Sequence, residues 1–176
     1  MNIKTYINKN VLKYILRYII NLIIDYFLII IFLFKAKINN REFKIVTISD
    51  AYFFDALTNL LISIHKHEPK IEVIIIDIGL TEKQIVYLKD NFNYKIKRFN
   101  FEKFPTFFKD YDLDGKLGSY AWKAPALLNE FYESEKNIIY LDAGCELRKS
   151  LDFLKFIILK NGFYSPESSN NIEYWT

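Results

Sequence analysis

The stretch IEVIIIDIG, residues 71–79, is a run of β-branched apolar residues that ends on an aspartate and a glycine. A strand that is apolar on both faces has to be covered on both faces, as strands are inside a parallel sheet. Two more segments end in a similar way, because KIVTIS (44–49) runs into Asp50 and NIIYL (137–141) runs into Asp142. The sequence therefore predicts buried strands that are each followed by a carboxylate.

Helical patterns separate these strands. Amphipathic segments at 51–67, 81–92 and about 120–134 predict helices, and YKIKRF at 94–99 alternates like a half-exposed strand. Thr81 and Gln84 have the spacing of a capping box at the start of the second helix. Alternating strands and helices predict an α/β, Rossmann-like, mainly parallel sheet. The irregular stretch 100–118 is long for a simple connection and is a candidate ligand-covering loop.

Composition excludes several classes of protein. The 176 residues are 51% hydrophobic and 18% aromatic, which fits a folded domain of ordinary size. The net charge of +3 is scattered along the chain, so nothing in the sequence indicates a nucleic-acid-binding surface. The single cysteine, Cys145, excludes an internal disulfide and is expected to be a small buried side chain.

The N-terminus, residues 1–40, is predicted to be a separate hydrophobic helix that associates with a membrane, followed by the α/β domain at 41–176. Val11 to Phe34 is almost wholly apolar. Its polar residues recur every fourth position and form one helical stripe: Lys9, Lys13, Arg17, Asn21 and Asp25. This pattern favours a helix lying at the membrane surface over one that spans it. The alternative is a long helix packed on a protein partner.

The three strand-end aspartates are candidate site residues. Ligands of parallel α/β sheets bind outside the carboxyl ends of the strands, so Asp50, Asp77 and Asp142 are expected at one edge. Asp50 has an equally good interpretation as a helix cap. Thr81 is a better cap than Asp77, which leaves Asp77 for a ligand.

Lys123 is a further candidate. Pro125 is tolerated in the first turn of a helix, which places Lys123 near a helix start, where the macrodipole disfavours a cation. A bound diphosphate would remove this conflict, because helix N-termini and lysines both attract phosphate. The alternative is a solvated surface lysine.

Three segments together resemble a known family: IVTISDAYFFDALTNLLISIHKHEP, VIIIDIGLTEKQ and YAWKAPALLNEFYESEKNIIYLDAGCEL. Over about residues 43–176 the chain is similar to nucleotide-diphospho-sugar transferases of GT-A fold, related to the family 8 glycosyltransferases. The resemblance implies donor-binding roles for six residues: Ser49, Asp50, Tyr52, Asp77, Lys123 and Asp142. In that family a DxD motif also holds a divalent metal, Mn²⁺ or Mg²⁺, on the diphosphate.

The chain departs from the DxD motif. Asp142 matches its first aspartate, but Gly144 stands where the second belongs. Glu146 is the second candidate metal ligand, although an extended backbone would place it about 13 Å from Asp142. A turn at Gly144 would bring the two carboxylates closer.

The resemblance implies a glycosyltransferase that moves a sugar from a nucleotide-diphosphate donor to a glycan, lipid or protein acceptor. It also implies an incomplete domain, since family members continue with further strands after GFYSPE. The alternatives are an inactive nucleotide-sugar-binding protein and a membrane-attached interaction protein. The N-terminal helix predicts membrane association and, if the source is bacterial, a catalytic domain in the cytoplasm.

Overall fold

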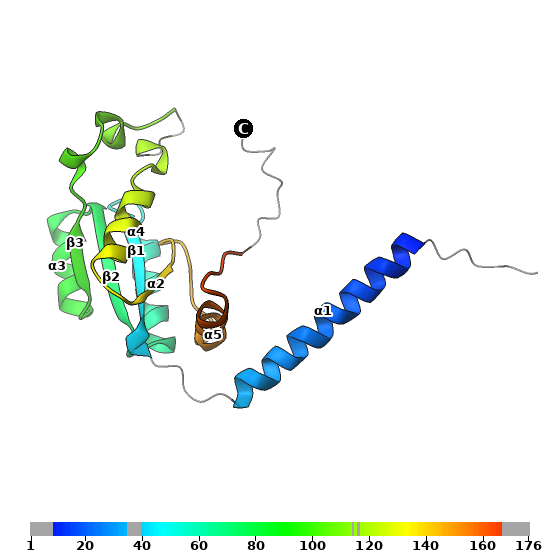
Figure 1. Cartoon of the computed structure of the whole chain (residues 1–176). Helices are drawn as coiled ribbons and strands as arrows, with labels where there is room; N and C mark the ends of the chain where they lie inside the picture. The colour runs from blue at the N-terminus through cyan, green and yellow to red at the C-terminus, as the bar shows by residue number, and fades with distance from the viewer. Residues whose placement is uncertain (1–8, 35–39, 114, 116, 167–176) are drawn as a thin grey trace, which may run out of the picture. The chain divides into compact units, whose positions relative to one another are not determined.

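The computed structural model describes residues 9–34, 40–113, 115 and 117–166. Asn39–Lys155 form one compact unit, and α1 belongs to a second unit with the chain from Phe156 onward. The helices and strands are α1 Lys9–Phe34, β1 Phe43–Asp50, α2 Phe54–His67, β2 Glu72–Gly79, α3 Glu82–Asn91, β3 Lys95–Arg98, α4 Lys123–Tyr132, β4 Asn137–Tyr140 and α5 Asp152–Asn161 (Figure 1). Short 3-10 turns occupy Asn40–Glu42, Phe101–Lys103, Thr106–Lys109 and Gly118–Tyr120.

The α1 helix has 26 residues, and all its side chains from Lys13 to Phe27 are exposed. Within the described part of the chain, no helix is both long enough and apolar enough to cross a membrane. The predicted association of α1 with a membrane surface stays a prediction.

Asn40 lies at the predicted boundary between the N-terminal helix and the α/β domain. Asn40 belongs to this unit, because its Oδ1 accepts a hydrogen bond from Lys155 Nζ at 2.6 Å and its Nδ2 donates to Glu68 Oε2 at 3.4 Å. At the other end the unit closes at Lys155, within α5, and the predicted division into residues 1–40 and 41–176 stays a prediction.

The four strands form one parallel sheet in the order β3-β2-β1-β4, which confirms the predicted mainly parallel α/β fold. Along β1, Ser49 lies beside Asp77 of β2, and Asp77 in turn lies beside Arg98 of β3. β4 is shorter and pairs only as far as Val46 with Tyr140. As expected for apolar strands covered on both faces, seven of the eight residues of β1 and six of the eight of β2 are buried.

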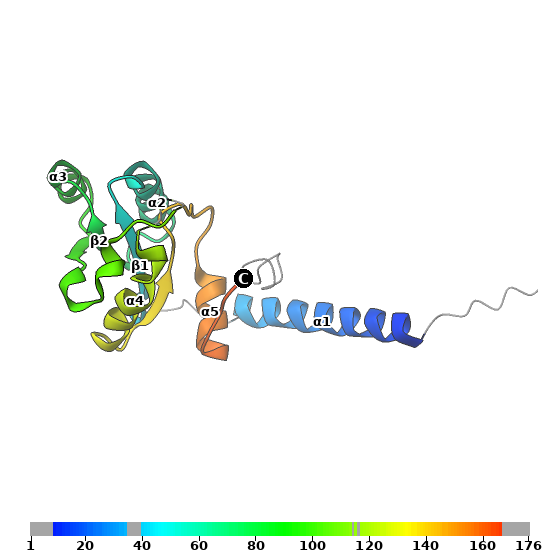
Figure 2. The same cartoon turned by 90° about the horizontal axis from the view of Figure 1, so that it is seen from above.

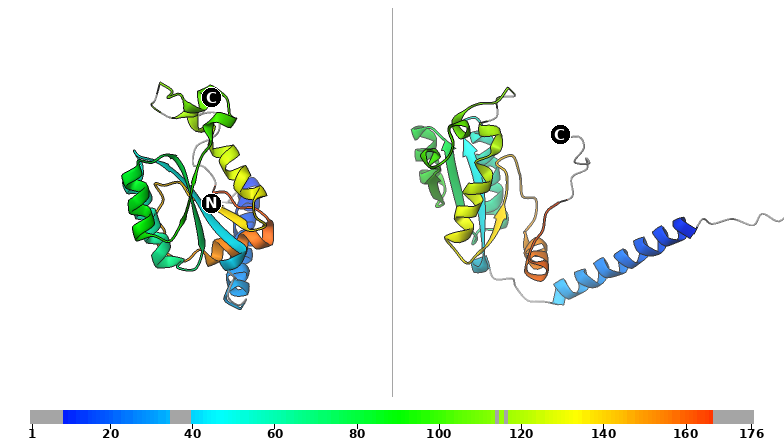
Figure 3. Two further views of the ribbon diagram at one scale, coloured as in Figure 1. Left: turned by 90° about the vertical axis from the view of Figure 1, so that its left-hand side faces the viewer. Right: turned by 45° about the horizontal axis from the view of Figure 1, so that its top comes forward.

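Two helices cover one face of the sheet and one helix covers the other. Figures 2 and 3 show α2 and α3 on one side and α4 on the opposite side. The capping box predicted at the start of α3 is present, with Thr81 N–H donating to Gln84 Oε1 and Gln84 N–H to Thr81 Oγ1. On the α4 face, alternate residues of β1 and β2 pack with the aromatic connection and α4: Val46, Ile48, Ile74, Ile76, Ile78, Phe99, Phe108, Trp122 and Ala126.

The connections place a topological switch point between β1 and β4. From β1 the chain steps to β2 and then β3 through α2 and α3 on one face, and it then returns through α4 on the other face to β4, beside β1. The connection that leaves β1 and the connection that enters β4 therefore cross opposite faces of the sheet. Ligands of doubly wound sheets bind at the carboxyl edge at such a point.

Candidate functional site

The switch point brings Ser49 and Asp50, at the end of β1, to the same sheet edge as Asp142, which follows β4. The residue between β4 and Asp142 continues the β1 pairing, since Leu141 N–H donates to Val46 O at 3.1 Å. The edge between β1 and β4 is therefore the position at which this fold offers a ligand site, and it holds two of the predicted carboxylates.

Lys123 and Asp142 form an ion pair at this edge. Lys123 Nζ donates to Asp142 Oδ1 at 2.8 Å, and the hydroxyl of Tyr140 donates to the same oxygen. Lys123 also lies over the Tyr120 ring, with Nζ 4.7 Å from its centroid. Since α4 begins at Lys123, the predicted position at a helix start is confirmed. A cation, a carboxylate and two phenols from three segments thus meet at the switch point.

The pair is partly open to solvent. The Asp142 side chain is 57% exposed and that of Lys123 is 29% exposed. Partial burial acts to raise the pKa of Asp142, but hydrogen bonds from Lys123 and Tyr140 and the positive charge of Lys123 together lower it below its ordinary value. Burial and the hydrogen bond to Asp142 raise the pKa of Tyr140. The carboxylate is therefore ionised and the phenol protonated near neutral pH, and both are accessible to a ligand.

The backbone just before α4 has an unusual conformation. Gly118, Ser119 and Tyr120 all have positive φ, at +54°, +46° and +63°. Ser119 and Tyr120 carry side chains in a region that disfavours them, which is a common form of strain at functional sites. Gly118 has no alternative, since a Cβ there would come 2.7 Å from the carbonyl oxygen of Phe108. This close approach sets the turn that presents Tyr120 and Lys123.

Buried ion pairs hold α4 on the sheet. Lys44, which is 1% exposed in β1, donates to Glu130 O at 2.7 Å and to Glu130 Oε2 at 3.1 Å. Lys97 of β3 pairs with the same Glu130 and, at 2.5 Å, with Glu133. Removing one member of such a group leaves a buried charge without a partner. These contacts therefore hold the C-terminal end of α4, the helix that begins at Lys123, against the sheet.

At the end of β1, Asp50 organises the turn into α2. Its Oδ1 accepts hydrogen bonds from the backbone N–H groups of Tyr52 and Phe53 at 3.0 and 3.1 Å, but the N-cap residue of α2 is Phe53, so Asp50 closes the turn before the helix and is not its N-cap. Ser49 is buried and donates its hydroxyl to Asp50 O at 3.1 Å. Tyr52 is 86% exposed and packs edge-on against the Phe53 ring. Of these residues, Tyr52 presents the largest free surface to a ligand.

The structure does not support a direct ligand contact for Asp77. This side chain is buried, and its Oδ1 accepts from the N–H groups of Gly79 and Leu80 at 2.8 and 2.6 Å. Its Oδ2 pairs with Arg98 at 2.6 Å. Asp77 also alternates with Ile76 and Ile78, which face α4, so it points to the other face of the sheet. Its role is to shape the connection between β2 and α3.

The predicted turn after Asp142 is present, and the predicted metal role of Asp142 and Glu146 stays a prediction. Cys145 N–H donates to Asp142 O at 2.9 Å, so the chain turns at Gly144. Glu146 is exposed. Across residues 9–34, 40–113, 115 and 117–166, no three histidine, cysteine, aspartate or glutamate side chains are grouped so that they could hold a metal ion. Cys145 is exposed, so the expectation of a small buried side chain was wrong.

Sequence reasoning missed the contribution of Tyr140. Its spacing of two from Asp142 on an extended segment puts the two side chains on the same face, which is a signal available in the sequence. The positive φ values of Ser119 and Tyr120 had no such signal, because neither residue type specifies this conformation.

Comparison with known proteins identifies the family. The family model described as "Protein of unknown function (DUF1647)" matches residues 15–127. The chain belongs to the DUF1647 family. The DUF1647 match includes most of α1, the strands β1 to β3 and Lys123, and it ends before β4 and Asp142. The family description assigns no function.

Among solved structures, a crystal structure of an active-site mutant of LgtC is similar to this DUF1647 protein, with 22% identity and a TM-score of 0.47. The similarity covers 63% of this chain and 41% of the LgtC chain, so this chain spans less than half of that protein's length. None of the curated proteins compared with the chain matches it.

Proposed function

We propose that the protein binds a nucleoside-diphosphate sugar at the carboxyl edge between β1 and β4 and transfers the sugar to an acceptor. The observation that carries the proposal is the Lys123–Asp142 pair, 2.8 Å apart, at the topological switch point of the sheet. A partly exposed cation at the start of a helix suits a diphosphate, and the neighbouring carboxylate and phenol suit sugar hydroxyls.

Lys123 is the residue proposed to bind the diphosphate. The N-cap residue of α4, Trp122, forms no side-chain cap, and Pro125 has no N–H, so the N–H groups of Lys123 and Ala124 are the ones offered to an anion along with the lysine. Asp142 currently shares this cation, but a partly exposed ion pair is worth only about 0–1 kcal/mol, so a diphosphate can compete for it. Once the diphosphate binds Lys123, Asp142 becomes available to accept hydrogen bonds from the sugar.

Aromatic rings on either side of this edge supply stacking surfaces. Tyr120 is 41% exposed beside Lys123, and Tyr52 is 86% exposed after β1. Stacking of a base on an aromatic ring is worth about 1–3 kcal/mol and tolerates different bases. We propose that one of these rings packs on the nucleobase, while Ser49 and Asp50 set the backbone that borders it.

The metal predicted from the resemblance stays a prediction. Asp142 Oδ1 already accepts from a lysine cation, and no three histidine, cysteine, aspartate or glutamate side chains are grouped for a metal among the described residues. We therefore assign the protein residues to binding and orientation only. A cation delivered with the diphosphate would neutralise charge on the leaving phosphate.

The test is a ligand titration of the full chain. UDP- and GDP-sugars are titrated with and without Mn²⁺ while thermal unfolding is followed, because a ligand selective for the folded state stabilises it by about 2.7 kcal/mol at a hundred times its Kd. We expect Lys123→Met to abolish the shift. The matched control is Lys103→Met, which removes an exposed lysine elsewhere. No shift at millimolar ligand, or equal loss in both variants, would contradict the proposal.

Turnover separates an enzyme from a binding protein. Release of the nucleoside diphosphate, measured with mixtures of glycan, lipid and peptide acceptors, supports the transferase. Saturable binding without release supports the alternative of an inactive nucleotide-sugar-binding protein.

A further inference from the structure

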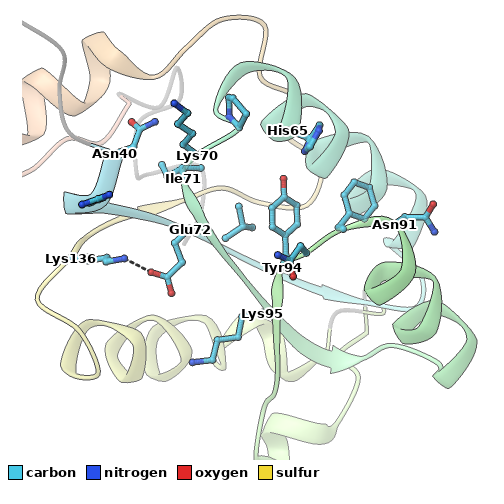
Figure 4. Close-up of a pocket in the computed structure, with 14 residues that line it drawn as sticks. Asn40, His65, Lys70, Ile71, Glu72, Asn91, Tyr94, Lys95 and Lys136 are labelled. Atoms are coloured by element: carbon cyan, nitrogen blue, oxygen red, sulfur yellow. Dashed lines mark hydrogen bonds and ion pairs between the residues drawn. The ribbon is translucent and has the colours of Figure 1, made fainter.

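A cavity lies at the amino edge of the sheet, opposite the edge that carries Lys123 and Asp142. It has a volume of about 450 Å³ and is lined by residues from the starts of β2 and β3 and from the segments beside them (Figure 4). Its charged lining comprises four lysine or arginine side chains and one carboxylate: Arg41, Lys70, Lys95, Lys136 and Glu72. The cavity is therefore strongly basic, although the chain as a whole carries only +3.

The single carboxylate is already paired. Lys136 Nζ donates to Glu72 Oε2 at 2.6 Å, and this hydrogen bond, with the charges of nearby lysines, lowers the pKa of Glu72. Lys70 and Lys95 are exposed and form no ion pair within the described residues. The positive charge of these two lysines is thus available to an anion that enters from solvent.

Neutral groups beside the lysines favour a hydrogen-bonding ligand over a simple ion. Asn93 is exposed at the rim, and Tyr94 is half-buried with its ring stacked on Phe92, centroid to centroid 5.7 Å. Burial raises the pKa of Tyr94, so its hydroxyl stays a donor near neutral pH. The amides and the phenol suit the polar part of a headgroup, and the lysines suit its phosphate.

The position of the cavity distinguishes it from the proposed donor site. The strand β1 has eight residues, so its two ends are separated by about 25 Å. Only residues 35–39 lie between the end of α1 and the turn Asn40–Glu42, which borders the cavity. The apolar, stripe-bearing helix is therefore tethered to the edge of the sheet that carries the basic cavity, and not to the edge that carries Lys123.

We infer that the basic cavity binds the phosphate of an anionic lipid headgroup when α1 lies on a membrane. A helix with an apolar face and a charged stripe binds at an interface, but one such anchor gives only reversible attachment, and a basic patch is the usual second contribution. The short connection makes headgroup binding effectively intramolecular once α1 is inserted. This inference does not depend on the proposed sugar transfer.

The experiment is vesicle co-sedimentation of the full chain without nucleotide sugars. Binding is compared between phosphatidylcholine vesicles and vesicles in which about a third of the lipid is phosphatidylserine. The test variant carries Lys70→Glu and Lys95→Glu. The matched control carries Lys83→Glu and Lys103→Glu, which change the net charge equally but lie in the first turn of α3 and after β3, near the carboxyl edge.

The expected result is a selective loss of anionic-lipid binding. Each basic residue near an anionic surface contributes about 1 kcal/mol, or roughly fivefold, so the test variant should bind the anionic vesicles about thirtyfold less tightly. Its binding to phosphatidylcholine should stay unchanged, and the control should lose little. Equal losses in both variants would mean diffuse electrostatic attraction and would overturn the inference, as would no loss in either.

Two further arms keep the test decisive. If the charge reversal disturbs folding, as judged by circular dichroism, Lys70→Gln with Lys95→Gln replaces it, and a smaller selective loss is expected. Inorganic phosphate and glycerophosphoserine are also titrated into the full chain during thermal unfolding. Stabilisation by soluble phosphate, with equal binding to the two vesicle types, would assign the cavity to a free phosphate and overturn the lipid assignment.

Discussion

Asp77→Asn and Asp142→Asn make the same chemical change in opposite environments, and they test the assignment of one carboxylate to structure and the other to a site. Asp77 is 1% exposed, and both of its oxygens are engaged, by two backbone N–H groups and by Arg98. An asparagine there must point its amide NH₂ group either at Arg98 or at the backbone donors. In both cases two donors face each other, either at the backbone N–H groups or at Arg98, whose side chain is 63% exposed.

The magnitudes follow from these contacts. A hydrogen bond to a charged group contributes about 1.5–3 kcal/mol and an unmatched buried donor costs about 1–3 kcal/mol, so Asp77→Asn should lower the free energy of unfolding by about 2–4 kcal/mol. Asp142 is 57% exposed and its lysine partner 29% exposed, so solvent screens the pair. Asp142→Asn should cost no more than about 1 kcal/mol.

The assay is urea denaturation of the full chain and both variants, followed by far-UV circular dichroism in a mild detergent that keeps α1 dispersed. Because the folded-state pKa of Asp142 is lowered, its small contribution to stability is present above the unfolded-state pKa of about 3.9. This contribution is lost as the pH falls through the lowered folded-state pKa. The difference between wild type and Asp142→Asn should therefore disappear in acid.

The outcome that refutes this reasoning is a loss of stability in Asp142→Asn as large as that in Asp77→Asn. Asp142 would then be a structural carboxylate, and the proposed donor site would lose its central residue. A mild effect on stability together with loss of the nucleotide-sugar shift is the result that the structure leads us to expect.

Two further substitutions probe the framework around the site. Lys155 Nζ pairs with Glu68 Oε2 at 2.6 Å, and the two side chains are 0% and 2% exposed. Lys155→Met leaves Glu68 as a buried charge and should lower the free energy of unfolding in urea by about 3–5 kcal/mol. A loss below about 1 kcal/mol would contradict this. Gly118→Ala should lower the free energy of unfolding by more than about 1–2 kcal/mol, because φ is +54° and the new Cβ would meet Phe108 O. Gly144→Ala is the control, since a Cβ there has open space and should change stability little. Equal melting temperatures for the two variants would show that the turn at Gly118 is not constrained.

Much of the fold could be predicted because its signals are local. Continuous β-branched runs predicted β1 and β2, and the capping box at Thr81 and Gln84 predicted where α3 begins. Pro125 predicted that Lys123 lies at a helix start. Each of these predictions depends on residues within about one helical turn or on the period of a strand, so the chain order alone contains the information.

The role of each carboxylate could not be predicted in this way, because it depends on partners that are distant in the sequence. Asp77 and Asp142 both lie at the ends of apolar strands. The buried Asp77 is paired with Arg98, 21 residues away, while Asp142 is paired with Lys123 at a solvent-exposed position. No local pattern specifies the direction of the crossover through α4. This crossover puts Lys123 and Asp142 on the α4 face of the sheet, whereas Asp77 points to the opposite face.

The order of strands and helices, the apolar character of both sheet faces and the carboxylates at the strand ends are all properties of the sequence, because backbone periodicity and side-chain hydrophobicity act over short distances. The tertiary structure decided which of those carboxylates face solvent and which edge of the sheet carries the basic cavity. Both depend on how the sheet is ordered and on which face each connection crosses, and these are settled only when segments far apart in the chain pack together.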